Sequence, residues 1–263
     1  MNQSPPLCSA EALGQALAAD GFAVVSASTL AQMAAVAAEQ LQALAPAWNH
    51  LAPDAYLRDG GRYRKRRHGS FVVEAGEARP VPHRAHWQPL DYNALHGGIE
   101  RWFEPLPPEW SGDAALVSLL RACAQAADGL HPGVARWFVE AHAFRIDCTD
   151  GIGRPTPEGA HRDGVDLVAV VLVGRHAIRG GETRVFAADG PAGVRFTLDE
   201  PFSALFLDDA RVIHESTPIQ PLVAGQPGWR DTLVITCRRG GFQDPPTASA
   251  VSLPRQPPAP AHA

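Results

Sequence analysis

Apolar residues in the second half of the chain fall in short runs separated by turn signals. Gly180-Gly181, Asp189-Gly190 and Gly225 supply such signals, and no helical pattern lies between the runs. The runs, rich in Val, Ile, Phe and Thr, cover residues 137–146, 165–173, 183–187, 194–198, 204–207 and 232–237. Many short strands with glycine turns favour a β-sandwich or barrel over an alternating α/β fold.

The first half has a different pattern. Ser9 and Gly21 bracket a predicted helix over residues 10–19, and a longer helix is predicted from Ser28 to about Ala45. Residues 46–108 are irregular, with one possible strand at 71–74, and a third helix is predicted over 113–128, where Gly129 follows as a stop. The pattern thus predicts a mainly β fold with flanking helices (α+β).

We expect one domain over residues 1–245. Its predicted parts are a helical decoration at 1–45, an irregular segment at 46–108 that flanks the active site, and a helix plus β core at 109–245. The Pro-rich stretch 246–263 is predicted to be a disordered tail.

Composition and charge narrow the class of protein. Hydrophobic residues make up 45% of the 263 residues and charged residues 19%, which suits a globular domain with a large core. The net charge of −5 argues against a nucleic acid or an anionic membrane as partner. Four cysteines without a CxxC pair, and no secretory or membrane-spanning pattern, lead us to expect a cytoplasmic protein. The sequence leaves the oligomeric state open, with a homodimer among the alternatives.

Two histidines and one aspartate are the candidate metal ligands. His161 and Asp163 stand two positions apart where an apolar strand begins, so in extended backbone they face the same side. His214 follows 53 residues later, just after another strand, and a jelly roll can bring the two strands together across its mouth. Two imidazoles and one carboxylate leave coordination positions open, as in non-haem Fe(II) oxygenases. Zinc is the rival metal, although structural zinc sites usually have four ligands, often cysteine, and no cysteine lies near either motif.

Arg230 opens the strand that follows His214 by 16 positions, and Thr232 shares its face. A guanidinium can bind the distal carboxylate of 2-oxoglutarate with two parallel hydrogen bonds, and Thr232 can add a hydroxyl donor. A solvated surface arginine is the alternative reading of the same residue.

Together these motifs resemble the 2OG-Fe dioxygenases that include the bacterial L-isoleucine hydroxylases and the biofilm stress and motility protein A-like proteins. The resemblance covers about residues 55–240 and implies a double-stranded β-helix (jelly roll, cupin-like). It also implies Fe(II) on His161, Asp163 and His214, with 2-oxoglutarate on Arg230 and O2 as the oxidant. It rests on residues 159–166 (GAHRDGVD), 180–186 (GGETRVF), 208–219 (DDARVIHESTPI), 230–233 (RDTL) and, less directly, 61–64 (GRYR).

Other polar residues have competing interpretations. The basic run 63–67 is predicted to be a solvated loop. A nucleic-acid-binding patch is the second interpretation, which the negative net charge of the chain disfavours. The resemblance implies a third, in which Tyr63 and an arginine such as Arg64 contact a substrate carboxylate. His142 is interpreted as a core or cavity-lining residue. His83 and His86, spaced HxxH in a Pro-rich stretch, are expected to be exposed, and Glu182 and Asp166 are assigned hydrogen bonds to the metal ligands.

These observations predict an Fe(II)- and 2-oxoglutarate-dependent dioxygenase that hydroxylates, or sulfoxidises, a small free amino acid or related small molecule. One alternative is a non-catalytic jelly-roll protein that binds a metal or ligand in stress or biofilm physiology, because one fold hosts many functions. Another is a zinc-dependent hydrolase, which would work without oxygen or a 2-oxo acid.

Overall fold

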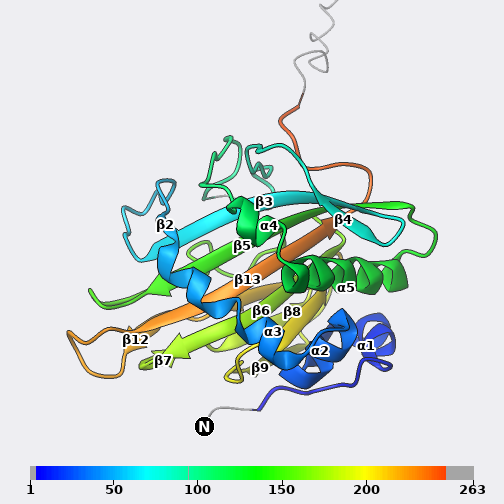
Figure 1. The fold of residues 1–263 in the computed structure, drawn as a ribbon. Helices are drawn as coiled ribbons and strands as arrows, with labels where there is room; N and C mark the ends of the chain where they lie inside the picture. The colour runs from blue at the N-terminus through cyan, green and yellow to red at the C-terminus, as the bar shows by residue number, and fades with distance from the viewer. Residues whose placement is uncertain (1–3, 94, 247–263) are drawn as a thin grey trace, which may run out of the picture.

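The computed structural model describes residues 4–93 and 95–246 and has a jelly-roll core with helices on one face (Figure 1). Its large sheet has eight strands, in the order β1-β10-β6-β13-β5-β3-β2 with β4 beside β3. The strands are antiparallel and span Phe22–Val25 (β1), Ala52–Pro53 (β2), Arg64–Glu74 (β3), Glu77–Pro80 (β4), Arg136–Asp147 (β5), Leu167–His176 (β6), Ala204–Asp208 (β10) and Trp229–Arg238 (β13).

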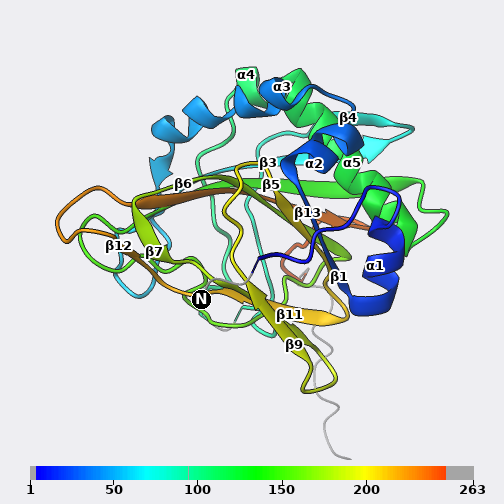
Figure 2. The ribbon, with the colours of Figure 1, turned by 90° about the horizontal axis from the view of Figure 1, so that it is seen from below.

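Two smaller sheets lie against the other face of the large sheet. Figure 2 shows them on the opposite side from the helices. One has the order β11-β8-β9 and the other pairs β12 with β7. Their strands are Ile178–Gly180 (β7), Thr183–Ala187 (β8), Gly193–Phe196 (β9), Val212–Ser216 (β11) and Ile219–Pro221 (β12). The predicted tail at 246–263 lies, apart from Pro246, outside the described residues.

The helices cover the outer face of the large sheet (Figures 1 and 2). They are Leu13–Asp20 (α1), Ala27–Ala34 (α2), Ala38–Gln42 (α3), the 3-10 helix Ala45–His50 (η1), Pro108–Ser111 (α4) and Ala114–Leu130 (α5). Leu116, Leu119 and Leu120 of α5 are buried in the main core, as the helical spacing predicts. None of the helices in the described part of the chain has the length and apolar character needed to cross a membrane.

The predicted single helix from Ser28 to Ala45 is wrong. The helical segment begins earlier, because the Ser26 hydroxyl caps α2 by accepting the Thr29 N–H at 3.2 Å. Ala35 then ends α2 with a left-handed φ of 53°. This turn separates α2 from α3, and both helices contact α5.

Two apolar cores lie on either side of the large sheet. The first packs the helices on the outer face and includes Leu17, Leu30 and Phe206. The second lies between the large and small sheets and includes Phe196, Leu198 and Leu205. Beside this second core the inner face becomes polar, because β3, β5 and β13 place charged residues there.

Candidate active site

His161 and His214 lie side by side through direct backbone pairing. The N–H of His161 donates to the carbonyl of His214 at 3.1 Å, and the N–H of His214 donates back at 2.9 Å. The first histidine precedes β6 and the second lies in β11, so the bridge joins the segment leading into the large sheet to a small sheet. The ring centroids are 4.6 Å apart.

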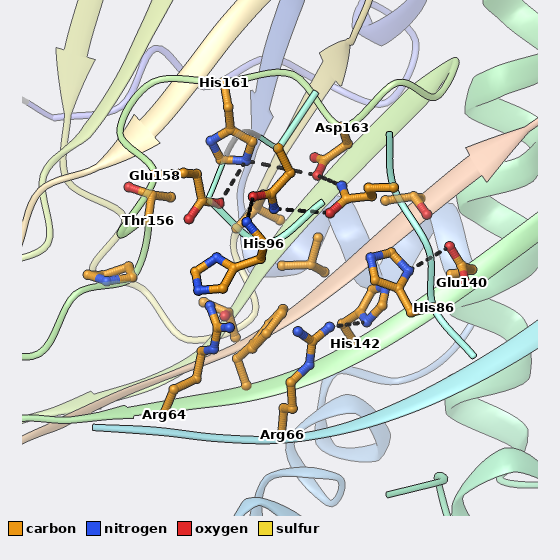
Figure 3. A pocket seen from close by; sticks show the side chains of 18 of the residues that line it. Arg64, Arg66, His86, His96, Glu140, His142, Thr156, Glu158, His161 and Asp163 are labelled. Atoms are coloured by element: carbon orange, nitrogen blue, oxygen red, sulfur yellow. Dashed lines mark hydrogen bonds and ion pairs between the residues drawn. The ribbon is translucent and has the colours of Figure 1, made fainter. Parts of the chain in front are cut away.

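Asp163 completes a group of three ligand-type side chains (Figure 3 shows His161 and Asp163). Its Oδ1 lies 3.9 Å from Nε2 of His161, and its Oδ2 lies 3.9 Å from Nε2 of His214. The three ligand atoms lie within 4.8 Å of one another. Because Nδ1 of His161 lies 2.9 Å from the Gly159 carbonyl, Nδ1 carries the proton in the neutral ring, and Nε2 then has a free lone pair.

Two residues that the sequence did not indicate hold Asp163 in place. The Gln88 side chain donates to Oδ1 of Asp163 at 3.2 Å, and the Asp209 carboxylate accepts the Asp163 N–H at 2.9 Å. The expected partners lie elsewhere: Glu182 pairs with Arg184, and Asp166 lies 3.2 Å from both His131 and Arg239. Among the described residues, neither Glu182 nor Asp166 hydrogen-bonds to a ligand side chain.

Burial and charge set the protonation of the site. Burial, together with the neighbouring His161, holds the pKa of His214 well below its ordinary value, so its imidazole is neutral. Burial also lowers the pKa of His161, but the Asp163 and Glu158 carboxylates have the larger combined effect, so the pKa of His161 is raised. Burial and the nearby Asp163 raise the pKa of Asp209 to about 7, although hydrogen bonds from three backbone N–H groups act to lower it.

Arg230 and Thr232 point from β13 into the same cavity. Arg230 is 3% exposed, and within the described structure its Nε and Nη2 have no hydrogen-bond partner. Burial lowers its pKa to about 10, helped by the nearby Arg175, so the group is still cationic at neutral pH. A buried guanidinium with free donors is a site that a carboxylate would satisfy.

The cavity has a volume of about 120 Å³ and is lined by the three ligand-type residues and by Arg64, Arg66 and His142. Figure 3 shows it from His161 and Asp163 to these three residues. The prediction of a solvated basic loop is wrong, because residues 64–67 belong to β3. Strand alternation buries Arg64 and Arg66 on the cavity face and leaves Lys65 and Arg67 half-buried on the other. The buried Asp54 lies 2.7 Å from Nε of Arg64 and 3.7 Å from Nη1 of Arg66.

Three further predicted residues lie as follows. Tyr63 is absent from the cavity lining of the described structure. It packs against a small apolar cluster that includes Ile146 and Ile219, and its hydroxyl donates to Asp59 at 2.6 Å. His83 is exposed, as expected. His86 is buried, contrary to expectation, because Glu140 lies 3.2 Å from its Nδ1 and offsets the cost of burying it.

The jelly roll, the three ligand-type side chains and the buried arginine together define a non-haem iron oxygenase. The chain belongs to the 2OG-Fe dioxygenase family, whose model matches residues 45–236. It is 51% identical to a bsmA homolog from Methylobium petroleophilum PM1, over 93% of this chain and 99% of that one, with a TM-score of 0.87.

More distant structures share the fold. IDO from Bacillus thuringiensis is 17% identical, over 92% of this chain and 99% of that one, with a TM-score of 0.71. The Fe(II)/α-ketoglutarate-dependent dioxygenase TqaL is 19% identical, over 87% and 86% of the two chains, with a TM-score of 0.67. No curated protein sequence matches the chain.

The family uses Fe(II), 2-oxoglutarate and O2, and the residues present fit them. His161, Asp163 and His214 form a two-histidine, one-carboxylate set of the kind that holds non-haem iron. The unpartnered Nε and Nη2 of Arg230 fit a carboxylate of 2-oxoglutarate.

Proposed function

We propose that this oxygenase hydroxylates, or sulfoxidises, a small free amino acid or a related small molecule in the cytoplasm. In this proposal His161, Asp163 and His214 hold the iron, Arg230 and Thr232 hold 2-oxoglutarate, and Arg64 and His142 contact the substrate. The presence of all four cysteines as thiols supports the cytoplasmic location.

The observation that carries the proposal is a second group of cations in the cavity that also contains the metal ligands. Arg64, Arg66 and Arg101 line it, and among the described residues Arg101 has no carboxylate partner. Nε of Arg66 and Nε of Arg101 are buried without a hydrogen-bond partner in the same part of the structure. Since 2-oxoglutarate is assigned to Arg230, this excess of donors calls for a second, separate carboxylate.

The chain's own groups have three tasks in the reaction. The His161 and His214 rings present nitrogen lone pairs, and Asp209 and Gln88 fix the Asp163 carboxylate between them. When bound, iron would let O2 act as the oxidant: one oxygen atom would enter 2-oxoglutarate as it is converted to succinate and CO2, and the other would enter the substrate. Apolar side chains, including Phe144, Val170 and Val234, line the cavity beside the polar groups and exclude water from the space for the reacting carbon.

Succinate release tests the proposal directly. Purified protein with Fe(II), 2-oxoglutarate and O2 is screened against the proteinogenic L-amino acids, and we expect one or a few of them to stimulate 2-oxoglutarate turnover and to gain an oxygen atom by mass spectrometry. The matched control is His161→Ala, which should abolish both signals. Stimulation by no amino acid, or activity that persists without O2 and 2-oxoglutarate, would contradict the proposal.

A further inference from the structure

Four buried side chains form a second polar cluster, separate from the group of His161, Asp163 and His214. His68 comes from β3, Glu140 and His142 from β5, and His86 from the segment between β4 and α4. Each is at most 7% exposed. We call these four residues the histidine–glutamate cluster. His86, Glu140 and His142 line the cavity that also contains the metal ligands (Figure 3).

Glu140 determines which nitrogen of His86 carries the proton. Its Oε2 lies 3.2 Å from Nδ1 of His86, and its Oε1 lies 3.0 Å from Nε2 of His68. A carboxylate only accepts hydrogen bonds, so Nδ1 of His86 is the N–H donor. Burial lowers the pKa of His86 to about 4, so the ring is neutral at pH 7 and its Nε2 is a free acceptor.

Arg66 fixes the opposite tautomer in His142, with the proton on Nε2. Its Nη2 lies 2.7 Å from Nδ1 of His142. Because a guanidinium only donates, Nδ1 of His142 is the acceptor and its Nε2 carries the proton. Burial, with His68 and His86 close by, holds the pKa of His142 well below its ordinary value, so this ring is neutral as well.

The cavity wall therefore presents an acceptor beside a donor. The His86 and His142 rings are 4.7 Å apart between centroids. Within the described residues neither Nε2 atom has a hydrogen-bond partner, each keeps some accessible surface, and both residues line the cavity. The Arg66 guanidinium is held in place by the rings of Phe103, at 3.5 Å, and Phe144, at 4.4 Å.

We propose that this end of the cavity binds the zwitterionic head group of a free α-amino acid. The substrate carboxylate accepts from Arg66 and from Nε2–H of His142, and the substrate ammonium donates to Nε2 of His86, next to the Glu140 carboxylate. The two substrate groups share one carbon, which matches the adjacent donor and acceptor. The inference rests on the proposed function and makes it more specific: 2-hydroxy acids and acids without the amino group lack the ammonium and are rejected.

The register of the sheet leads from this head-group site along an apolar strip. His142 pairs with Val234 of β13, which pairs with Val170 of β6, and both valines line the cavity. Phe144 lies two residues from His142 on the same face of β5 and lines it too. A side chain attached to the clamped head group would lie on this strip, so an aliphatic amino acid fits better than a charged one.

A second metal ion is the competing occupant of the histidine–glutamate cluster, since its ligand atoms lie within 4.8 Å of one another. Two contacts disfavour it. Arg66 occupies the Nδ1 lone pair of His142 and leaves a proton on the other nitrogen, and Nη1 of Arg84 lies 3.9 Å from Glu140. A divalent cation here would face two guanidinium groups.

The test measures binding in protein loaded with Co(II) and 2-oxoglutarate without O2, so that no turnover occurs. Proteinogenic L-amino acids are titrated by calorimetry, followed by the 2-hydroxy and desamino analogues of whichever binds most tightly. The analogues should bind at least 10-fold more weakly. His86→Leu should weaken the amino acid roughly 10- to 100-fold, the effect of losing a hydrogen bond to a charged group, while the already weak 2-hydroxy acid changes much less.

His83→Leu is the matched control, because it removes an exposed histidine from the same segment and should change neither affinity. His142→Gln, which keeps a side-chain donor, should weaken the amino acid less than His142→Leu, and an unchanged affinity for 2-oxoglutarate shows that each variant is folded. Equal binding of the amino acid and its 2-hydroxy analogue, or no binding of any amino acid, overturns the inference. Binding of a second equivalent of metal per protein molecule, abolished by His86→Leu, would also overturn the inference.

Failure of the inference is distinguishable from failure of the proposed function. Succinate formed by the iron-loaded protein in the absence of any substrate reports the oxygenase chemistry alone. An amino acid that binds but gains no oxygen contradicts the proposed function and leaves the head-group site intact. A hydroxylated product that has no amino group contradicts the head-group site.

Discussion

The carboxylate of Asp209 fixes the backbone at Asp163. It accepts the N–H of Asp163 at 2.9 Å and those of the next two residues, Gly164 and Val165, at 2.7 and 3.1 Å. Asp209 follows β10 and precedes β11, the strand that carries His214. One buried side chain therefore ties together the two segments that supply the proposed metal ligands.

Asp209→Asn is expected to weaken metal binding roughly 10- to 100-fold, the usual effect of removing a group that orients metal ligands. The amide has one oxygen where the carboxylate has two, so at least one backbone N–H faces another N–H. Co(II) titration followed by visible absorption measures the affinity. Asp208→Asn is the control, since in the described part of the chain that carboxylate accepts from the exposed Ala210 N–H alone. Unchanged affinity in folded Asp209→Asn protein would contradict the orienting role.

Arg230→Lys should raise the dissociation constant for 2-oxoglutarate by about 30-fold, because an ammonium keeps the charge but loses the paired donors, a loss of about 2 kcal/mol. Anaerobic calorimetry of the Co(II)-loaded protein gives this constant. Metal affinity should stay at the wild-type value, because the group of three ligands does not include Arg230. Arg179→Lys, on an exposed arginine that donates to Gln220, is the matched control. Equal 2-oxoglutarate affinities in the two variants would assign the cosubstrate elsewhere.

The sequence predicts the core strands and the placement of His161 and Asp163 on one side because both depend on short-range pattern, whereas His214, 53 residues away, joins the candidate set only through the expected jelly roll. His161 and Asp163 share a strand-like spacing, and the runs around Val170 and Ile235 carry the Val and Ile content of buried strands. The helix at Ala114–Leu130 was predicted over 113–128, since leucine spacing is a local signal, but Gly129, the predicted stop, lies inside it.

What the sequence could not predict depends on pairing between distant segments. Arg64 and Arg66 are in an unusually polar strand, in which Asp54 offsets part of their charge and β5 pairs alongside. Gln88 and His86 lie in backbone without regular periodicity, and their partners, Asp163 and Glu140, are more than 50 positions away. No local pattern encodes such contacts, so residues 46–108 were placed least well.

Asp113 should stabilise the long helix α5 through its cap. Its Oδ1 accepts the N–H of Ala115 at 2.8 Å and that of Leu116 at 3.2 Å. Asp113→Ala is expected to lower the free energy of unfolding by about 1 kcal/mol, and the melting temperature by about 2–4 °C for a protein of this size. Asp113→Ser, which keeps a capping oxygen, should recover most of the loss. Equal melting temperatures for the Ala and Ser variants would show that the cap contributes nothing.

The buried neutral His86 should make stability depend on pH in a defined window. Its pKa falls from 6.5 to about 4 on folding, chiefly because of burial. Between these values the unfolded chain binds more protons than the folded protein, so the free energy of unfolding rises with pH. The stabilisation is therefore lost as the pH falls from 6.5 towards 4. The full difference is roughly 3 kcal/mol. Glu140, whose pKa is lowered well below 4.5, acts in the same direction at the acid end.

Urea unfolding of the metal-free protein at half-unit steps from pH 4 to pH 7.5 measures this dependence. His86→Gln keeps an N–H for Glu140 but cannot titrate, so its stability should fall less steeply below pH 6.5, by up to about 1.4 kcal/mol per pH unit. His83→Gln removes an exposed histidine from the same segment and should follow the wild type. Parallel curves for wild type and His86→Gln would mean that folding does not lower the pKa of His86, contrary to the prediction.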